Sequence, residues 1–212
     1  MMLPASRTIC AVPNVEHDAH GRRKGRCGCG QVELLERVVQ GDCTAHQKLR
    51  IGTGRGAGAG RALRLNTTLT SLDLYHKDLG EGGGRSLAGK LRLNTTLTSL
   101  DLCDNGTGED GGRALAETLR LDTTLTSLDH HRNGLGEGGG RALAEALLLN
   151  TTLASLNLHY NLLGEGGGRA LAAALRLNTT VASIDLREHG LRVEIQSALG
   201  EVWGDRAGSL VL

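Results

Sequence analysis

One short segment of this chain recurs at a fixed interval of 28 residues. It reads Leu-Asn-Thr-Thr-Leu at residues 65–69 and returns, with small changes, at residues 93, 121, 149 and 177. Four full repeats therefore occupy residues 66–177, and a fifth decays after Leu191. A unit of this length cannot bury its own apolar face, so neighbouring units must stack on one another into a solenoid.

The hydrophobic period changes within each repeat. Leu72 and Leu74 alternate with polar neighbours, as in a short strand that is buried on one face. Leu87 and Leu91 stand four residues apart, which is the spacing of a helix. Each unit is therefore predicted to be a strand, a turn and a helix, and the regular step places the strands side by side in a parallel sheet.

The repeat resembles a known family. Leu153, Leu156, Leu158, Asn161 and Leu163 reproduce the pattern Leu-x-x-Leu-x-Leu-x-x-Asn-x-Leu of leucine-rich repeats. With its 28 residues and its Gly-Glu-Gly-Gly-Gly-Arg-Ala-Leu-Ala segment, the unit looks like the ribonuclease-inhibitor type. The resemblance implies an α/β leucine-rich repeat solenoid, a short horseshoe with parallel strands on the concave face and short helices on the convex face.

The same resemblance assigns structural roles to asparagines after the strands. Asn105, Asn133 and Asn161 are expected to hydrogen-bond the backbone from repeat to repeat, whereas Lys77 and His189 replace them at the two ends. We therefore expect looser ends.

Two further positions depart from the repeat, because His130 and Thr107 stand where other units have leucine. Burial of an unpartnered imidazole costs about 1–3 kcal/mol, so His130→Leu is predicted to raise the melting temperature. The glycine runs before each helix, such as residues 82–84, predict helices that are short and start late.

The chain divides into three parts. Residues 1–50 do not share the repeat and are predicted to be largely disordered, with a helix at residues 31–40. Residues 51–191 hold the repeats, partial at each end, and residues 192–212 are predicted to form a capping helix and a tail.

Composition narrows the functional classes. The 24 basic and 23 acidic residues nearly balance, which gives no electrostatic case for a nucleic acid or an anionic membrane as partner. No apolar run is long enough to span a membrane, and the five cysteines are an odd number, typical of reduced thiols. We expect a cytoplasmic monomer without a cofactor.

The exposed face of the predicted sheet carries two columns of candidate partner-binding residues. The first is an acidic stripe that favours a basic partner surface; it contains Asp73, Asp101, Asp129 and Asp185, with Asn157 between the last two. The second, which we call the contact column, varies most between repeats and contains Tyr75, Cys103, His131, His159 and Arg187.

The contact column also holds residue types that chemistry uses. Cys103, His131 and His159 are the ligand types of a tetrahedral zinc site. Alternatively, Cys103 and His131 with a neighbouring aspartate resemble a nucleophile, a base and an orienting group. The spacing of adjacent strands, about 4.8 Å, separates the outer residues widely, so ordinary contact residues are the favoured interpretation and no metal or catalytic residue is assigned.

The favoured function is a non-catalytic module that binds a protein partner on the concave face. It rests on the fold resemblance and on the exposed columns. Two alternatives come from other members of the resembled family: a GTPase-activating protein or regulator of the Ran type, and a sensor fragment of the NOD-like receptor type.

Overall fold

The computed structural model describes residues 48–50, 67–204, 206 and 208–212. Its strands form a single parallel sheet of seven, in chain order. The strands are β1 (Lys48–Arg50), β2 (Ser71–Asp73), β3 (Ser99–Asp101), β4 (Ser127–Asp129), β5 (Ser155–Asn157), β6 (Ser183–Asp185) and β7 (Ser209–Val211). The helices are α3 (Gly80–Leu91), α4 (Gly108–Leu119), α5 (Gly136–Leu147), α6 (Gly164–Leu177) and α7 (Val193–Trp203).

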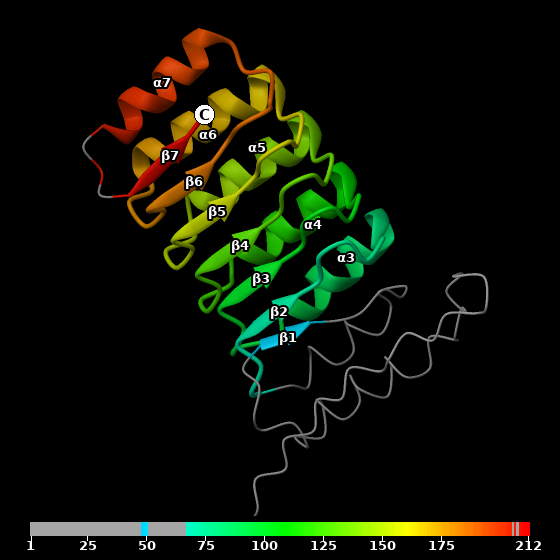
Figure 1. The fold of residues 1–212 in the computed structure, drawn as a ribbon. Helices are drawn as coiled ribbons and strands as arrows, with labels where there is room; N and C mark the ends of the chain where they lie inside the picture. Colours follow the sequence, from blue (N-terminus) through cyan, green and yellow to red (C-terminus); the bar gives the residue numbers. More distant parts are fainter. Residues whose placement is uncertain (1–47, 51–66, 205, 207) are drawn as a thin grey trace, which may run out of the picture.

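The architecture is the predicted α/β leucine-rich repeat solenoid. Figure 1 shows the strands stacked along one face and helices α3–α7 stacked along the other. Equivalent leucines lie in buried columns between the two layers, because the register pairs Leu72 with Leu100 and continues through Leu128, Leu156 and Ile184. A second buried column comes from the helices, and it consists of Leu87, Leu115, Leu143, Leu171 and Leu199.

One leucine column lies outside this core. The leucine that opens each Leu-Asn-Thr-Thr segment, or its Leu-Asp-Thr-Thr variant, lies at or just after the end of a helix and is exposed, from 57% to 73% of its surface. These residues are Leu93, Leu121, Leu149 and Leu177. The repeat therefore presents an apolar row to solvent along one edge of the helix layer.

The sheet extends beyond the predicted repeat region at both ends. Lys48 pairs with Ser71, so β1 begins before the expected boundary at residue 51. At the other end, Ser209 pairs with Ser183, and β7 occupies part of the segment that was expected to be a tail. Helix α7 buries Ile195, Leu199 and Trp203 against the preceding repeat. The helix predicted at residues 31–40 lies outside the described residues.

The prediction that the helices start late is wrong. Helices α3–α6 begin at the first glycine of each run, where a positive φ near 60° suits glycine. The last glycine of the run lies against the next repeat. A Cβ on Gly84 would lie 3.0 Å from the Thr107 Cβ and 3.2 Å from the Gly111 Cα. The glycines are therefore helical because neighbouring helices approach closely there, which offsets their low helix propensity.

The asparagine side chains join successive repeats as the resemblance implies. In each case the side-chain amide donates to a carbonyl of the preceding repeat, at 2.9 Å from Asn105 to Leu74, 2.9 Å from Asn133 to Leu102 and 2.8 Å from Asn161 to His130. We call this row the asparagine ladder.

The ladder continues one repeat further than predicted. The backbone N–H of Asn161 donates to Nδ1 of His189 at 3.3 Å, so the imidazole replaces the missing asparagine as an acceptor. Burial, followed by the proximity of His159, lowers the pKa of His189 to about 4, which keeps the ring neutral and able to accept. The expected looseness at this end is therefore reduced by a different residue type. At the other end, the backbone N–H of Lys77 still donates to Oδ1 of Asn105 at 2.9 Å.

The two departures at His130 and Thr107 contact each other. The Thr107 hydroxyl lies 2.9 Å from Nε2 of His130 and 3.2 Å from Oδ1 of Asn133. Because the amide oxygen only accepts, the hydroxyl donates to Asn133 and accepts from His130. His130 is fully buried, its Nδ1 has no partner, and burial lowers its pKa to about 4. The polar pair thus extends the ladder into the core but leaves one nitrogen unsatisfied.

The glycine contacts generate a paired prediction within one helix. Gly84→Ala should destabilise the protein by about 1–3 kcal/mol, because its Cβ meets the next repeat. Gly89→Ala, in the same helix but with no atom within 4 Å of a Cβ, should stabilise it by about 0.5–1 kcal/mol. Urea unfolding followed by circular dichroism measures both; equal effects would contradict the packing argument.

The buried imidazoles predict a pH-dependent stability. Between pH 6.5 and 4 the histidine side chains become protonated in the unfolded chain, whereas His130 and His189 stay neutral in the folded protein. Stability is therefore fully present above pH 6.5 and falls as the pH drops towards 4. His130→Leu should raise the melting temperature at neutral pH and reduce this pH-dependent loss by up to about 3 kcal/mol. An unchanged pH profile in the variant would show that His130 does not carry the effect.

Candidate functional site

The acidic stripe has a structural role in every repeat. Each of its side chains accepts, through Oδ1, the backbone N–H two residues later, at 2.9–3.1 Å. The acceptors are Asp73, Asp101, Asp129, Asn157 and Asp185. This bond turns the chain out of the strand and fixes the backbone of the contact column, and Asn157 shows that an amide oxygen performs it as well as a carboxylate.

Charge along the stripe is not uniform. Burial, together with repulsion from Asp129 and Asp73, raises the pKa of Asp101 above its usual 3.8. Burial also acts on Asp185, but hydrogen bonds from Arg187 outweigh it and lower that pKa. The Arg187 guanidinium binds both oxygens of Asp185, at 2.6–3.2 Å. Among the described residues, the Asp101 and Asp129 carboxylates on β3 and β4 have no such arginine partner, so the stripe is more negative there than at Asp185.

The structure brings Cys103, His131 and Asp129 into one hydrogen-bonded chain. The Sγ of Cys103 lies 2.9 Å from Nε2 of His131, and Nδ1 of His131 lies 3.0 Å from Oδ1 of Asp129. Because a carboxylate only accepts, Nδ1 carries the proton and Nε2 accepts from the thiol. This is the order of a nucleophile, a base and an orienting group that the sequence left as an alternative.

Burial argues against a nucleophilic role for this chain of residues. Cys103 is only 2% exposed, so a substrate cannot reach the sulfur. Burial and the nearby carboxylates of Asp129 and Asp101 raise the pKa of the thiol to about 12, whereas an activated cysteine needs a lowered pKa. The Cys103 thiol is therefore a packed group beneath the partly exposed His131 ring.

The three candidate zinc ligands do not converge. His159 stacks on His131 with ring centroids 5.8 Å apart and an interplanar angle of 26°. Across the described residues, no group of three or more histidine, cysteine or acidic side chains is arranged to hold a metal ion. The histidines instead form part of an aromatic surface.

That surface includes residues that the sequence analysis missed. Tyr160 packs edge-on against His159, with centroids 6.3 Å apart, and the Arg132 guanidinium lies 5.6 Å from the centre of the Tyr160 ring. With His131, these residues form what we call the aromatic cluster, which lies over β4 and β5. Tyr160 is 51% exposed, although aromatic residues make up only 1% of the chain.

Arg132 and Tyr160 belong to a further column, which we call the turn column, one residue after the contact column. All five of its residues have a positive φ of 52–59°, which turns their side chains outward at the strand ends. The column consists of His76, Asp104, Arg132, Tyr160 and Glu188. Its variability between repeats was a signal in the sequence, but strand alternation alone does not place it on the same face.

At the first repeats the strand face is more open. Tyr75, which begins the contact column, is 51% exposed, and its neighbour His76 lies 3.0 Å from Asp104 through Nδ1.

Within the part of the chain that the structure describes, no helix is both long and apolar enough to cross a membrane.

The buried thiol gives a prediction for chemical labelling. In a variant with serine at four other cysteines, native Cys103 should react with iodoacetamide at least about 100-fold more slowly than in urea, because little thiolate forms. Those four are Cys10, Cys27, Cys29 and Cys43. Mass spectrometry measures the rates. Rapid labelling of the native protein that is lost in His131→Ala would instead reveal an activated thiolate.

Comparisons with known proteins agree with this geometry. A family model described as Leucine Rich repeat matches residues 93–116. No curated protein matches the sequence significantly. Among solved structures, the chain is similar to actin-binding site 2 of leiomodin-1, with 21% identity, a TM-score of 0.57, and coverage of 80% of this chain and 85% of that one.

Two further structures are similar. The C-terminal domain of tropomodulin from Caenorhabditis elegans has 14% identity and a TM-score of 0.55, over 81% of this chain and 90% of that one. The leucine-rich repeat protein LegL7 from Legionella pneumophila has 21% identity and a TM-score of 0.51, over 82% and 58%. At these identities the similarity concerns the fold. Together with the 28-residue strand-and-helix units of this chain, it shows a leucine-rich repeat fold.

Proposed function

We propose that this protein is a non-catalytic interaction module whose concave strand face binds a protein partner. The observation that carries the proposal is the aromatic cluster formed by His131, His159, Tyr160 and Arg132. Tyrosine and arginine are enriched among the residues that dominate binding energy at interfaces. Here they are held in a row by ring contacts, so little conformational entropy remains to be lost on binding.

The acidic stripe supports a partner with basic side chains. Asp101 has its pKa raised by burial and by Asp129 and Asp73, so the three carboxylates repel one another in the free protein. A cationic partner group placed between them would relieve this repulsion and speed association. On the other side of the cluster, the Arg187–Asp185 ion pair leaves little net charge. The proposed footprint is therefore acidic over β2–β4 and aromatic over β4–β5.

The experiment neutralises carboxylates of the acidic stripe but keeps the hydrogen bonds that form the turn after each strand. Asp101→Asn with Asp129→Asn keeps the Oδ1 acceptors, as Asn157 does naturally, and should weaken partner binding about tenfold. Tyr160→Ala should weaken it by a similar factor. Partners are captured from a cell extract on the immobilised full-length chain, and each is then measured by titration.

The matched control carries two neutralised charges on the helix face, Glu117→Gln and Glu145→Gln, and should leave binding unchanged. Purified actin is the first named partner to test, because the similar leiomodin-1 structure is described as an actin-binding site. Partners that bind the strand-face variants as tightly as the unmodified protein would contradict the proposal.

The alternatives suggested by the family resemblance gain no specific residue here. A GTPase-activating role would require stimulated GTP hydrolysis by small GTPases. The nucleophile-like residue of the described strand face, Cys103, is a buried thiol and offers no support for a catalytic role. A hydrolysis assay with the full-length chain separates this role from simple binding. We expect no stimulation.

A further inference from the structure

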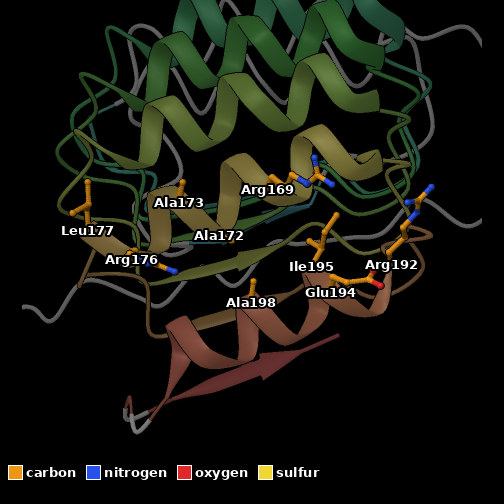
Figure 2. A pocket seen from close by; sticks show the side chains of 9 residues that line it. All are labelled: Arg169, Ala172, Ala173, Arg176, Leu177, Arg192, Glu194, Ile195 and Ala198. Atoms are coloured by element: carbon orange, nitrogen blue, oxygen red, sulfur yellow. The ribbon is translucent and has the colours of Figure 1, made fainter.

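The last two helices of the solenoid are separated by a groove that is distinct from the strand face. The groove between α6 and α7 encloses about 640 Å³ (Figure 2). Its middle is apolar, and both of its ends carry arginines. The lining residues are Arg169, Ala172, Ala173, Arg176, Leu177, Arg192, Glu194, Ile195 and Ala198.

The groove opens because the glycine contact is lost at this repeat. Gly140 of α5 faces Gly167 of α6, where a Cβ would come within 3.2 Å of the neighbouring Cα. The position equivalent to Gly167 in α7 is Ile195, and its Cγ2 lies 2.9 Å from a Cβ built on Gly168. A branched side chain thus replaces a glycine between the helices. It holds α7 away from α6 and exposes alanine side chains along the gap.

The arginines of the groove differ in their partners. Arg169 and Arg192 both bind the carboxylate of Glu165, so one end of the groove already holds a carboxylate between two guanidinium groups. Arg176 makes no ion pair among the described residues, and Figure 2 shows its guanidinium pointing into the gap. Glu194 is the single acidic lining residue, so the groove has an excess of positive charge.

The spacing of these groups matches a helix. Arg169 and Arg176 lie seven residues apart on α6, or about 10.5 Å along its axis, which is two helical turns. Between them lie Ala172 and Ala173, and at the far end Leu177 is 73% exposed. A helix with an apolar stripe and carboxylates two turns apart would place its stripe on the alanines and its carboxylates at the arginines.

We infer that the groove between α6 and α7 binds an acidic amphipathic helix of a partner protein. The partner's leucine-type side chains fill the apolar middle, and its carboxylates pair with Arg176 at one end and with Arg169 and Arg192 at the other. The groove is a hollow between two helices, a shape that suits a partner helix better than a flat lipid surface. This site is independent of the strand face, so the chain holds two partners at once.

The test uses a fluorescent synthetic helix of about 14 residues with a leucine stripe flanked by glutamates. Its control peptide has the same leucines flanked by lysines. Anisotropy titration with the full-length protein should show binding of the glutamate peptide only. Arg176→Glu should weaken this binding by about tenfold or more. Arg92→Glu, at the equivalent position three repeats earlier, is the matched control and should bind normally.

A second variant tests the apolar middle. Ala173→Trp fills the groove from an exposed position and should abolish peptide binding, while unchanged melting temperatures confirm that both variants fold. Equal affinity for the two peptides, or no effect of Arg176→Glu, would overturn the proposal.

Two other occupants have their own signatures. Binding to phosphatidylserine vesicles without peptide binding would point to a membrane surface. Concentration-dependent dimers in light scattering that Arg176→Glu dissociates, again without peptide binding, would point to a second copy of the chain. Either result would replace the partner helix.

Discussion

The asparagine ladder is the interaction on which the rest of the structure depends. Each strand ends in a turn whose carbonyls would be buried without partners, and Asn105, Asn133 and Asn161 satisfy them from the next repeat. A buried unsatisfied carbonyl costs about 1–3 kcal/mol, so the turns hold their shape only while the repeats stay in register. The register in turn aligns the leucine columns and the exposed strand face. At the last repeat His189 replaces only the acceptor of an asparagine, through the bond from the Asn161 N–H, and its Nε2 has no partner; the burial of this neutral ring also lowers stability in acid.

Much of the fold could be predicted because strand and helix have different hydrophobic periods. Leu72 and Leu74 alternate, whereas Leu87 and Leu91 stand four apart, and both patterns recur in register. The helix starts could not be predicted from propensity, since Gly84 lies in a helix that packs so closely on the next repeat that a Cβ there would come 3.2 Å from the Gly111 Cα. Contacts between neighbouring repeats cannot be inferred from the sequence pattern within one repeat. The same limit hid the exposure of the leucine column that includes Leu177.

The strand-face residues were predicted as columns, but their contacts were not. Repeat spacing places Cys103, His131 and His159 just after neighbouring strands. It does not specify that the thiol turns inward to the imidazole while the two rings stack. Those choices depend on side-chain rotamers and on the turn that the Asp129 carboxylate fixes. The turn column was missed for a related reason: its positive φ rotates Tyr160 out of strict alternation and beside His159.

Near-neutral total charge conceals two surfaces of opposite character. Carboxylates gather over β2–β4, where Asp101 is already destabilised by its neighbours, whereas the groove at α6 and α7 gathers three arginines around alanines. The repeat itself creates this separation, because any residue type at one position of the unit is multiplied along one face. It also explains where the groove lies. The repeats before it are nearly identical and close against each other through glycines, and the groove lies where Ile195 ends that identity. A solenoid built from nearly identical repeats thus places one proposed binding surface along the strand-face columns. It places the other, the groove, where the repeat pattern ends.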